Sequence, residues 1–202
     1  MKIFIFRIKQ LLLGWGFVGV IYNLADHLQG PGRLITPLWI DAMIPFSSSG
    51  IWAYLSFFLI IPLGYTLAPL NAVRWFARSM QMAALGAGAV YLIWPTTLLT
   101  PSDMGQGISS ILTERLIALD STQNCLPSLH ITLTTLAIWV VAKKRCGKMT
   151  LLFVTWGVAI AFSILQLKRH LFIDLIGGLI LAVVAGAMAQ WISTKQKERC
   201  CE

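Results

Sequence analysis

The segment LFIDLIGGLILAVVAGAMAQWI, residues Leu171–Ile192, decides the fold, because it is apolar apart from Gln190 and one ionisable residue, Asp174. A helix of about 20 apolar residues is long enough to cross the hydrocarbon core of a bilayer. The whole chain is similar in character: of its 202 residues, 57% are apolar and 12% are charged. Soluble domains usually carry about 25% charged residues. The sequence therefore predicts a membrane protein.

Five more apolar segments lie upstream of this one: Leu11–Ala25, Ile51–Leu70, Met80–Thr97, Ser128–Ala142 and Met149–Leu167. About 17 residues still suffice for a span, so neighbouring residues must complete the short first and fourth segments. The first segment resembles a signal peptide, but no small-residue cleavage site follows it, and we expect a retained helix. We predict an all-α, polytopic membrane protein with one membrane-embedded domain, residues 1–202, built as a six-transmembrane-helix bundle.

Two connections between these segments differ from ordinary loops. Gly30–Gly50 contains three prolines and an apolar stretch, Leu34–Ile44, that is too short and broken to span. We expect it to be an interfacial or re-entrant piece. Leu98–Pro127 is the longest polar stretch, and a connection of that length in a compact bundle is usually functional or disordered.

The distribution of positive charge orients the chain. Short loops rich in Lys and Arg remain cytoplasmic. With the N-terminus inside, 12 of the 16 basic residues fall on the inner side, and the outer side holds Arg33, Arg115, Lys168 and Arg169. We therefore expect both termini in the cytoplasm, as in a protein of the bacterial inner membrane. The inner set is Lys2, Arg7, Lys9, Arg74, Arg78, Lys143, Lys144, Arg145, Lys148, Lys195, Lys197 and Arg199.

The net charge of +8 does not indicate nucleic-acid binding. Its basic residues form short clusters between apolar segments and are not interleaved with aromatic residues, as single-strand binding would require. We expect membrane lipids as partners, no nucleic acid, and no obligate protein partner.

The first group of residues with chemical potential is Asn124–His130, NCLPSLH. Proline is favoured at the first position of a helix, where its missing N–H would have no partner. Ser128 and His130 would then lie in the first turn, among free backbone N–H groups that favour an anion. The alternative is that Pro127 only starts a helix and that His130 packs at the membrane interface.

The second group is Lys168–Asp174, KRHLFID, at the start of the last apolar segment. His170 and Asp174 are four residues apart and therefore share one helical face. A carboxylate on one ring nitrogen fixes the tautomer and makes the other nitrogen a better nucleophile. An ionisable residue such as Asp174 inside an apolar membrane helix also costs free energy, so its presence indicates a function. The alternative is an interfacial histidine beside an aspartate at a helix start.

Both groups fall on the outer side by the count of basic residues. Two histidines, a serine, a helix N-terminus and nearby cations are what phosphoryl transfer through a phosphohistidine requires. One histidine attacks phosphorus, the other protonates the leaving oxygen, and fixed donors hold the remaining oxygens.

The two groups together resemble a known family. Pro127-Ser128-Leu129-His130 is similar to the P-S-x-H motif of the type 2 phosphatidic acid phosphatases (PAP2), which share a helical core with the vanadium haloperoxidases. His170 and Asp174 are similar to the H-x-x-x-D that ends the family's third motif, and Ser163 falls where that motif begins.

Upstream, Leu38–Phe46 (LWIDAMIPF) and Tyr91–Thr96 (YLIWPT) resemble the inositol-phosphorylceramide-synthase-like branch. The resemblance covers roughly residues 38–185. It implies a helix bundle of the PAP2/haloperoxidase-like type that uses neither a metal nor another cofactor. It also implies a substrate that is a lipid phosphate or lipid diphosphate, whose headgroup reaches the outer face of the membrane.

The resemblance also implies individual roles. His170 would be the nucleophile, Asp174 its orienting carboxylate, His130 the general acid, and Ser128 a ligand of the phosphate. The third motif usually has Arg directly after its serine, where this chain has Ile164, and the Lys and Arg of the first motif are absent from Trp94–Pro101.

Other cations must therefore complete the phosphate clamp. Lys168 is the first candidate, because it lies two positions before the nucleophile as in the named branch. Arg169 would more readily face the membrane surface, and Arg115 is the reserve.

These residues predict a lipid phosphatase or a lipid phosphotransferase, two activities that differ only in which hydroxyl attacks the phosphohistidine. The alternative is a catalytically degenerate relative that binds or moves lipid, favoured by the missing arginines. A transporter is the third option, although the sequence has no inverted repeat or paired broken helices.

The charge distribution makes a testable prediction. Single cysteines placed in the segment Ser102–Gln106, in a background without native cysteines, should be labelled by an impermeant thiol reagent from outside. Cysteines at Lys143–Lys148 should stay unlabelled. The reverse pattern would contradict the orientation and move the site to the cytoplasm.

Overall fold

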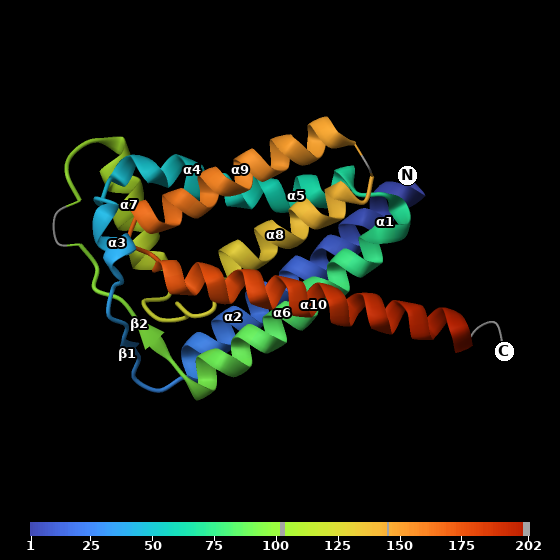
Figure 1. Cartoon of the computed structure of the whole chain (residues 1–202), viewed down its shortest axis with the longest axis horizontal. Coiled ribbons are helices and arrows are strands. Elements are labelled where there is room, and N and C mark those ends of the chain that lie inside the picture. Colours follow the sequence, from blue (N-terminus) through green and yellow to red (C-terminus); the bar gives the residue numbers. More distant parts are fainter. Residues whose placement is uncertain (102–103, 145, 200–202) are drawn as a thin grey trace.

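The structure is a computed structural model, and it describes residues 1–101, 104–144 and 146–199. Apart from one pair of two-residue strands, the regular elements of these residues are helices, which confirms the prediction of an all-α protein (Figure 1). Arg145 from the count of basic residues, and Ser102 and Asp103 from the segment proposed for labelling, lie outside the described residues.

The elements follow one another along the chain with short connections. In order they are α1 (Lys2–Leu11), η1 (Leu12–Gly16), α2 (Phe17–Leu28), β1 (Arg33–Leu34), α3 (Trp39–Met43), η2 (Ser48–Gly50), α4 (Ile51–Leu55), α5 (Phe57–Leu67), η3 (Leu70–Ala72), α6 (Val73–Ile93), β2 (Thr96–Thr97), α7 (Ile108–Leu119), α8 (Leu129–Ala142), α9 (Gly147–Gln166) and α10 (Phe172–Arg199).

Within the described residues, four helical runs are long and apolar enough to cross a membrane: Lys2–Leu28, Ser48–Leu67, Gly147–Gln166 and Phe172–Gln196. The other two predicted spans correspond to α6 and α8. Helix α6 has 21 residues but carries Arg74, Arg78 and Gln81, and α8 has only 14 residues. The structure thus supports a helical membrane protein without confirming six spans, and the six-helix count stays a prediction.

Three local expectations need correction. Helix α6 begins at Val73, well before the expected Met80, so its first turns include arginines that were assigned to a loop. The long polar connection contains helix α7, whose apolar residues recur every three to four positions. Helix α8 begins at Leu129, so Ser128 is its N-cap residue and Pro127 precedes the helix instead of opening it.

Helix α8 is the centre of the bundle. Its sequence LHITLTTLAIWVVA is apolar on every side, the pattern of a helix buried all round. Helices α5, α6, α9 and α10 pack against it. Large exposed apolar side chains instead lie on the outer helices, for example Val20, Leu59, Val158 and Ile180. The bundle thus turns an apolar outer surface to its surroundings, as lipid requires.

Most of the long helices lie roughly along the long axis of the molecule, which therefore has two distinct ends (Figure 1). The start of α1 and the last turns of α10 lie at one end, which we call the terminal end. The starts of α8 and α10 lie at the other, together with α3, α7 and the β1–β2 pair (Figure 1). In that pair, Arg33 lies opposite Thr96 and Leu34 opposite Thr97 in parallel register. We call this second end the histidine end, because it holds His130 and His170.

Helices α8 and α10 cross closely near their starts. The backbone N–H of Ser128 donates to the carbonyl oxygen of Asp174 at 3.1 Å. The hydroxyl of Thr132 donates to the carbonyl of Gly178 at 2.9 Å. A Cβ atom at Gly178 would lie 2.6 Å from the carbonyl oxygen of Ser128, so only glycine permits this approach. This close approach therefore brings the segments that hold His130 and His170 together.

The crossing predicts the effect of adding one methyl group. Gly178→Ala forces the two backbones apart, and we expect it to lower the free energy of unfolding by about 1–3 kcal/mol. The measurement is the thermal unfolding midpoint of the purified protein in detergent. Gly16→Ala is the matched control, because a Cβ atom at that helical position meets nothing within 4 Å. Equal midpoints for the two variants would contradict the close crossing.

Candidate active site

The two histidines predicted to carry the chemistry lie side by side. His130 is in the first turn of α8, and His170 is two residues before α10 begins. Their ring centroids are 5.7 Å apart, with the ring planes inclined at 64°. The two rings are therefore close enough to contact one small group together. The segments meet because of the α8–α10 crossing.

His170 is oriented by the start of α10. Nδ1 of His170 lies 3.5 Å from Oδ2 of Asp174, and the Asp174 side chain is fully buried. The same carboxylate oxygen accepts a hydrogen bond of 2.8 Å from the backbone N–H of Leu171. Oδ1 of Asp174 and Nδ1 of His170 have no hydrogen-bond partner among the described residues. A carboxylate beside Nδ1 favours the proton on that nitrogen and leaves Nε2 as the free nitrogen.

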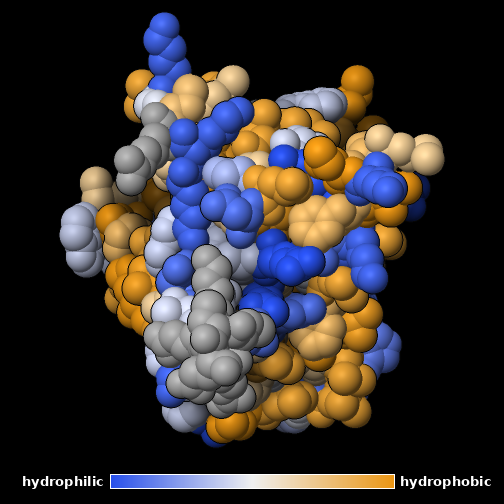
Figure 2. Space-filling view, turned by 90° about the vertical axis from the view of Figure 1, so that its right-hand side faces the viewer, coloured by the Kyte–Doolittle hydropathy of each residue, from blue (hydrophilic) through white to orange (hydrophobic). Residues whose placement is uncertain are grey.

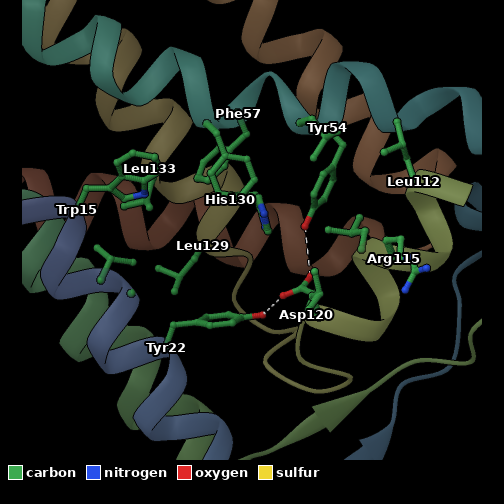
Figure 3. Close-up of a pocket in the computed structure, with 16 residues that line it drawn as sticks. Trp15, Tyr22, Tyr54, Phe57, Leu112, Arg115, Asp120, Leu129, His130 and Leu133 are labelled. Atoms are coloured by element: carbon green, nitrogen blue, oxygen red, sulfur yellow. Dashed lines mark hydrogen bonds between the residues drawn. The ribbon is translucent and has the colours of Figure 1, made fainter. Parts of the chain in front are cut away.

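His130 lies between aromatic rings at the wall of a cavity. Its ring centroid is 4.8 Å from that of Tyr54 and 4.6 Å from that of Phe57. The cavity has a volume of about 480 Å³ and lies among α2, α4, α5, α7 and α8. Figure 3 shows His130, Tyr22, Tyr54 and Asp120 grouped on one side, with Trp15, Leu129 and Leu133 beyond them. The cavity is thus apolar over most of its wall and polar next to the histidine.

Ser128 has an unused hydroxyl group. A serine at the N-cap normally accepts a hydrogen bond from an N–H in the first turn of its helix. Here the Ser128 side chain makes no capping bond, is completely buried, and has no partner for Oγ within the described part of the chain. A buried polar atom without a partner is costly unless a ligand completes it. Ser128 Oγ therefore fits a group that binds a substrate oxygen.

Arg169 belongs to a charged cluster with Asp120. Its Nη2 atom donates to Oδ2 of Asp120 at 2.9 Å and to the carbonyl of Ser121 at 2.7 Å. The hydroxyls of Tyr22 and Tyr54 donate to the same carboxylate at 2.7 and 3.2 Å (Figure 3). The Nε atom of Arg169 is buried and has no partner among the residues described. One N–H of the guanidinium thus remains available for an anion.

The cluster has a clear electrostatic consequence. Burial alone would raise the pKa of Asp120, but the Arg169 guanidinium and the Tyr22 hydroxyl stabilise the carboxylate, and the net effect lowers the pKa below its ordinary value. Asp120 is therefore ionised at neutral pH. Asp120 and His130 line the same cavity, so the cluster lies beside this histidine (Figure 3).

Lys168 is engaged by the backbone of α3. Its ammonium donates to the carbonyl of Asp41 at 2.7 Å and also to the carbonyl of Ile44. The residue has φ of 54°, a left-handed conformation that is uncommon for a residue other than glycine. These two bonds use two of the three ammonium donors and offset the strain of the turn that leads from α9 to His170. The geometry thus gives Lys168 a role in holding α3 against this turn.

Asp41 joins the same turn to α10. Its carboxylate accepts from the N–H of Phe172 at 2.7 Å and from the N–H of Leu38 at 2.8 Å. The side chain is buried, and its two bonds tie the start of α3 to the first residue of α10. The segment Gly30–Gly50, expected to be interfacial or re-entrant, therefore contacts the loop that carries His170 and helps to hold it in place.

Arg115, the remaining predicted phosphate ligand, lies on α7 at the edge of the cavity (Figure 3). Its side chain is exposed. Asp120, Tyr22, Tyr54 and Asp41 were not predicted as site residues. Asp41 lies within the quoted segment LWIDAMIPF, and Asp120 within the long polar connection, but only the fold brings either near the histidines. In the described residues, no group of three or more His, Cys, Asp or Glu side chains could hold a metal ion.

Comparison with known proteins gives one match. The family model of the PAP2 superfamily matches residues 36–188, well over half of the chain, and spans both histidine segments. No curated protein and no solved structure matches the chain. The match does not separate the inositol-phosphorylceramide-synthase-like branch from others, so that assignment stays a prediction.

Proposed function

The chain belongs to the PAP2 superfamily, and we propose that it is an integral-membrane lipid phosphatase or phosphotransferase that works through a phosphohistidine at His170. Membership points to phosphatase-type activity. One observation supports the phosphohistidine mechanism and the lipid substrate. The ring centroids of His170 and His130 are 5.7 Å apart, and His130 lies in the wall of a largely apolar cavity.

The proposed reaction has two steps. In the first, Nε2 of His170 attacks phosphorus, the bond from phosphorus to the leaving oxygen breaks, and protonated His130 gives its proton to that oxygen. Asp174 stabilises the positive charge that develops on the His170 ring. In the second step, water or another hydroxyl attacks phosphorus, neutral His130 accepts its proton, and the N–P bond breaks. With water the product is phosphate, and with an alcohol it is a new phosphate ester.

The phosphate oxygens need fixed donors, because negative charge is spread over them in the transition state. We assign this role to the Ser128 hydroxyl and to the Nε–H of Arg169, both of which are buried and unpartnered among the described residues. Asp120 fixes the rest of the guanidinium, which lowers the entropic cost of holding it in place. Lys168 is the weaker candidate, since two backbone carbonyls already occupy its ammonium.

A lipid is the substrate that suits the cavity. Its walls are formed mainly by leucine, valine and aromatic side chains, and its polar groups are concentrated near His130. Such a site accommodates a hydrocarbon chain while the phosphate meets the histidines. The substrate class we propose is therefore a lipid phosphate or lipid diphosphate.

The outer membrane face is the proposed location of the reaction. The histidine end carries Arg33, Arg115, Lys168 and Arg169, whereas most other basic residues are near the terminal end. The positive-inside rule then favours cytoplasmic termini and an extracytoplasmic site. The labelling experiment above tests this orientation.

The histidine roles predict distinct kinetic defects. His170→Ala should abolish release of phosphate from lipid phosphates and from p-nitrophenyl phosphate, because it removes the nucleophile. His130→Ala should impair lipid substrates strongly but p-nitrophenyl phosphate much less, because p-nitrophenolate leaves without protonation. The measurement is phosphate release by purified protein in detergent, with acid-labile phosphate on the quenched enzyme as a second readout.

Two results would count against this proposal. If His170→Ala retains activity while His130→Ala does not, the roles are reversed. If the unmodified protein releases no phosphate from any lipid phosphate tested, the alternative of a catalytically degenerate, lipid-binding relative gains support.

The two candidate cations can be separated by comparing activity with stability. Arg169→Ala should lower kcat/KM at least tenfold, about 1.4 kcal/mol of transition-state stabilisation. Lys168→Ala should mainly lower the thermal midpoint, because it frees α3. Arg115→Ala serves as the charge-matched control with a small effect on both. A larger activity loss in Lys168→Ala than in Arg169→Ala, at equal thermal midpoints, would restore Lys168 as the phosphate ligand.

A further inference from the structure

A second cavity lies at the terminal end, far from the histidines. Its volume is about 650 Å³, and its wall is formed by the chain around the start of α6, the end of α8 and the last turns of α10. Figure 2 views this end of the molecule and shows hydrophilic residues gathered among apolar ones. Three cations line the cavity, Arg74 and Arg78 from α6 and Lys143 from the end of α8. The cavity therefore carries a concentrated positive charge.

The partners of these cations are neutral. Nη1 of Arg78 donates to the hydroxyl of Ser193 at 3.4 Å, and Nζ of Lys143 donates to the side-chain carbonyl of Gln190 at 3.2 Å. Lys143 also lies 3.5 Å above the ring centroid of Trp75, a buried side chain in the wall of the cavity. Among the described residues, no carboxylate forms an ion pair with any of the three cations.

The acidic residues explain why no counter-charge is present in the described part of this cavity. Those whose side chains are described lie in α2, α3, α7, the segment after α7, and α10 at its start, all at the histidine end (Figure 1). They are Asp26, Asp41, Glu114, Asp120 and Asp174. Positive charge is thus gathered at one cavity while the described carboxylates are placed at the opposite end.

Cations that have no carboxylate partner among the described residues are unfavourable in a partly enclosed space. Burial lowers the pKa of Lys143 from its ordinary value, because desolvation disfavours its charged form. The two arginines remain charged under all physiological conditions and repel it. An anion with several oxygens would pair with all three groups and restore the favourable charge balance.

We propose that this cavity binds a phosphate group, carried either by an anionic lipid headgroup or by a small soluble phosphate ester. Guanidinium groups suit phosphate because their planar donors match two of its oxygens. The Gln190 and Ser193 side chains, already next to the cations, add neutral donors for the remaining oxygens. Neither histidine contributes, so the site is separate from the one proposed for catalysis.

The general excess of Lys and Arg on the cytoplasmic side of membrane proteins does not account for the arrangement of the cations in this cavity. A cytoplasmic Lys or Arg that only orients the chain can remain solvated on the surface, as exposed Lys148 does. Arg78 and Lys143 are instead partly buried in the cavity and hydrogen-bond to side chains of α10, whereas Arg74, which also lines the cavity, is exposed. Three separate helices therefore build one site.

The test measures binding of two phosphate-bearing probes to the purified full chain in detergent. Native mass spectrometry would compare phosphatidylglycerol with phosphatidylcholine of identical chains, and equilibrium dialysis would measure binding of glycerol 3-phosphate. The variants are Arg74→Gln, Arg78→Gln and Lys143→Gln, and Lys148→Gln is the matched control for loss of one positive charge at the same end.

We expect each cavity variant to weaken binding of at least one probe threefold or more, while Lys148→Gln leaves it unchanged. Loss confined to phosphatidylglycerol identifies a lipid headgroup, and loss confined to glycerol 3-phosphate identifies a soluble ester. The histidine site is intact in all of these variants, so any binding there does not change between them. Arg78→Lys, which keeps the charge but loses the planar guanidinium, should weaken binding less than Arg78→Gln.

Two outcomes would overturn the proposal. In one, the cavity variants and Lys148→Gln weaken binding equally, which would show a general effect of surface charge. In the other, none of the correctly folded cavity variants changes the binding of either probe, which would show that the cavity does not take phosphate.

Discussion

The close approach of α8 and α10 at Gly178 is the contact on which the rest of the site depends. The absence of a side chain there lets the N–H of Ser128 reach the carbonyl of Asp174, and Thr132 reach the carbonyl of Gly178. These are contacts of backbone atoms or of a short side chain, so they leave little freedom for sliding. Ser128 and His130 begin one helix, His170 and Asp174 begin the other, and their relative positions follow from this single crossing.

A second layer of contacts holds the segment just before α10. Asp41 caps the start of that helix from α3, Lys168 bonds back to carbonyls of the same α3 region, and Arg169 joins Asp120. Each of these side chains bonds to backbone atoms or to a charged group from a distant part of the chain. The turn that carries His170 is thus held by contacts from α3 and from the segment after α7, which fixes the position of this histidine.

The sequence was sufficient for the parts of this arrangement that depend on local spacing. The four-residue separation of His170 and Asp174 predicts that they share a face, and the long apolar segments predict an all-helical membrane protein. Long-range partners could not be predicted, because nothing in the sequence relates Asp120 to Arg169 or Asp41 to Phe172 before the helices are packed. The sequence favoured Lys168 over Arg169 as the phosphate ligand for the same reason. The spacing of Lys168 from His170 gives no information on the backbone carbonyls to which its ammonium donates. The start of α8 was missed by two residues, since a proline before a helix and a proline within its first turn look alike in sequence.

The enclosed position of α6 and α8 has a consequence for how the protein enters its membrane. These two helices are the ones that fall short of the composition or the length of an independent span, and both pack against several neighbours. A short or arginine-bearing helix gains little from lipid on its own, so its stable position depends on helices that leave the ribosome later, above all α10. In the six-span arrangement predicted from the sequence, insertion of α6 and α8 would therefore depend on completion of the chain. That prediction counts the two helices as two crossings, so it places the two termini on the same side of the membrane whether this pair is included or not.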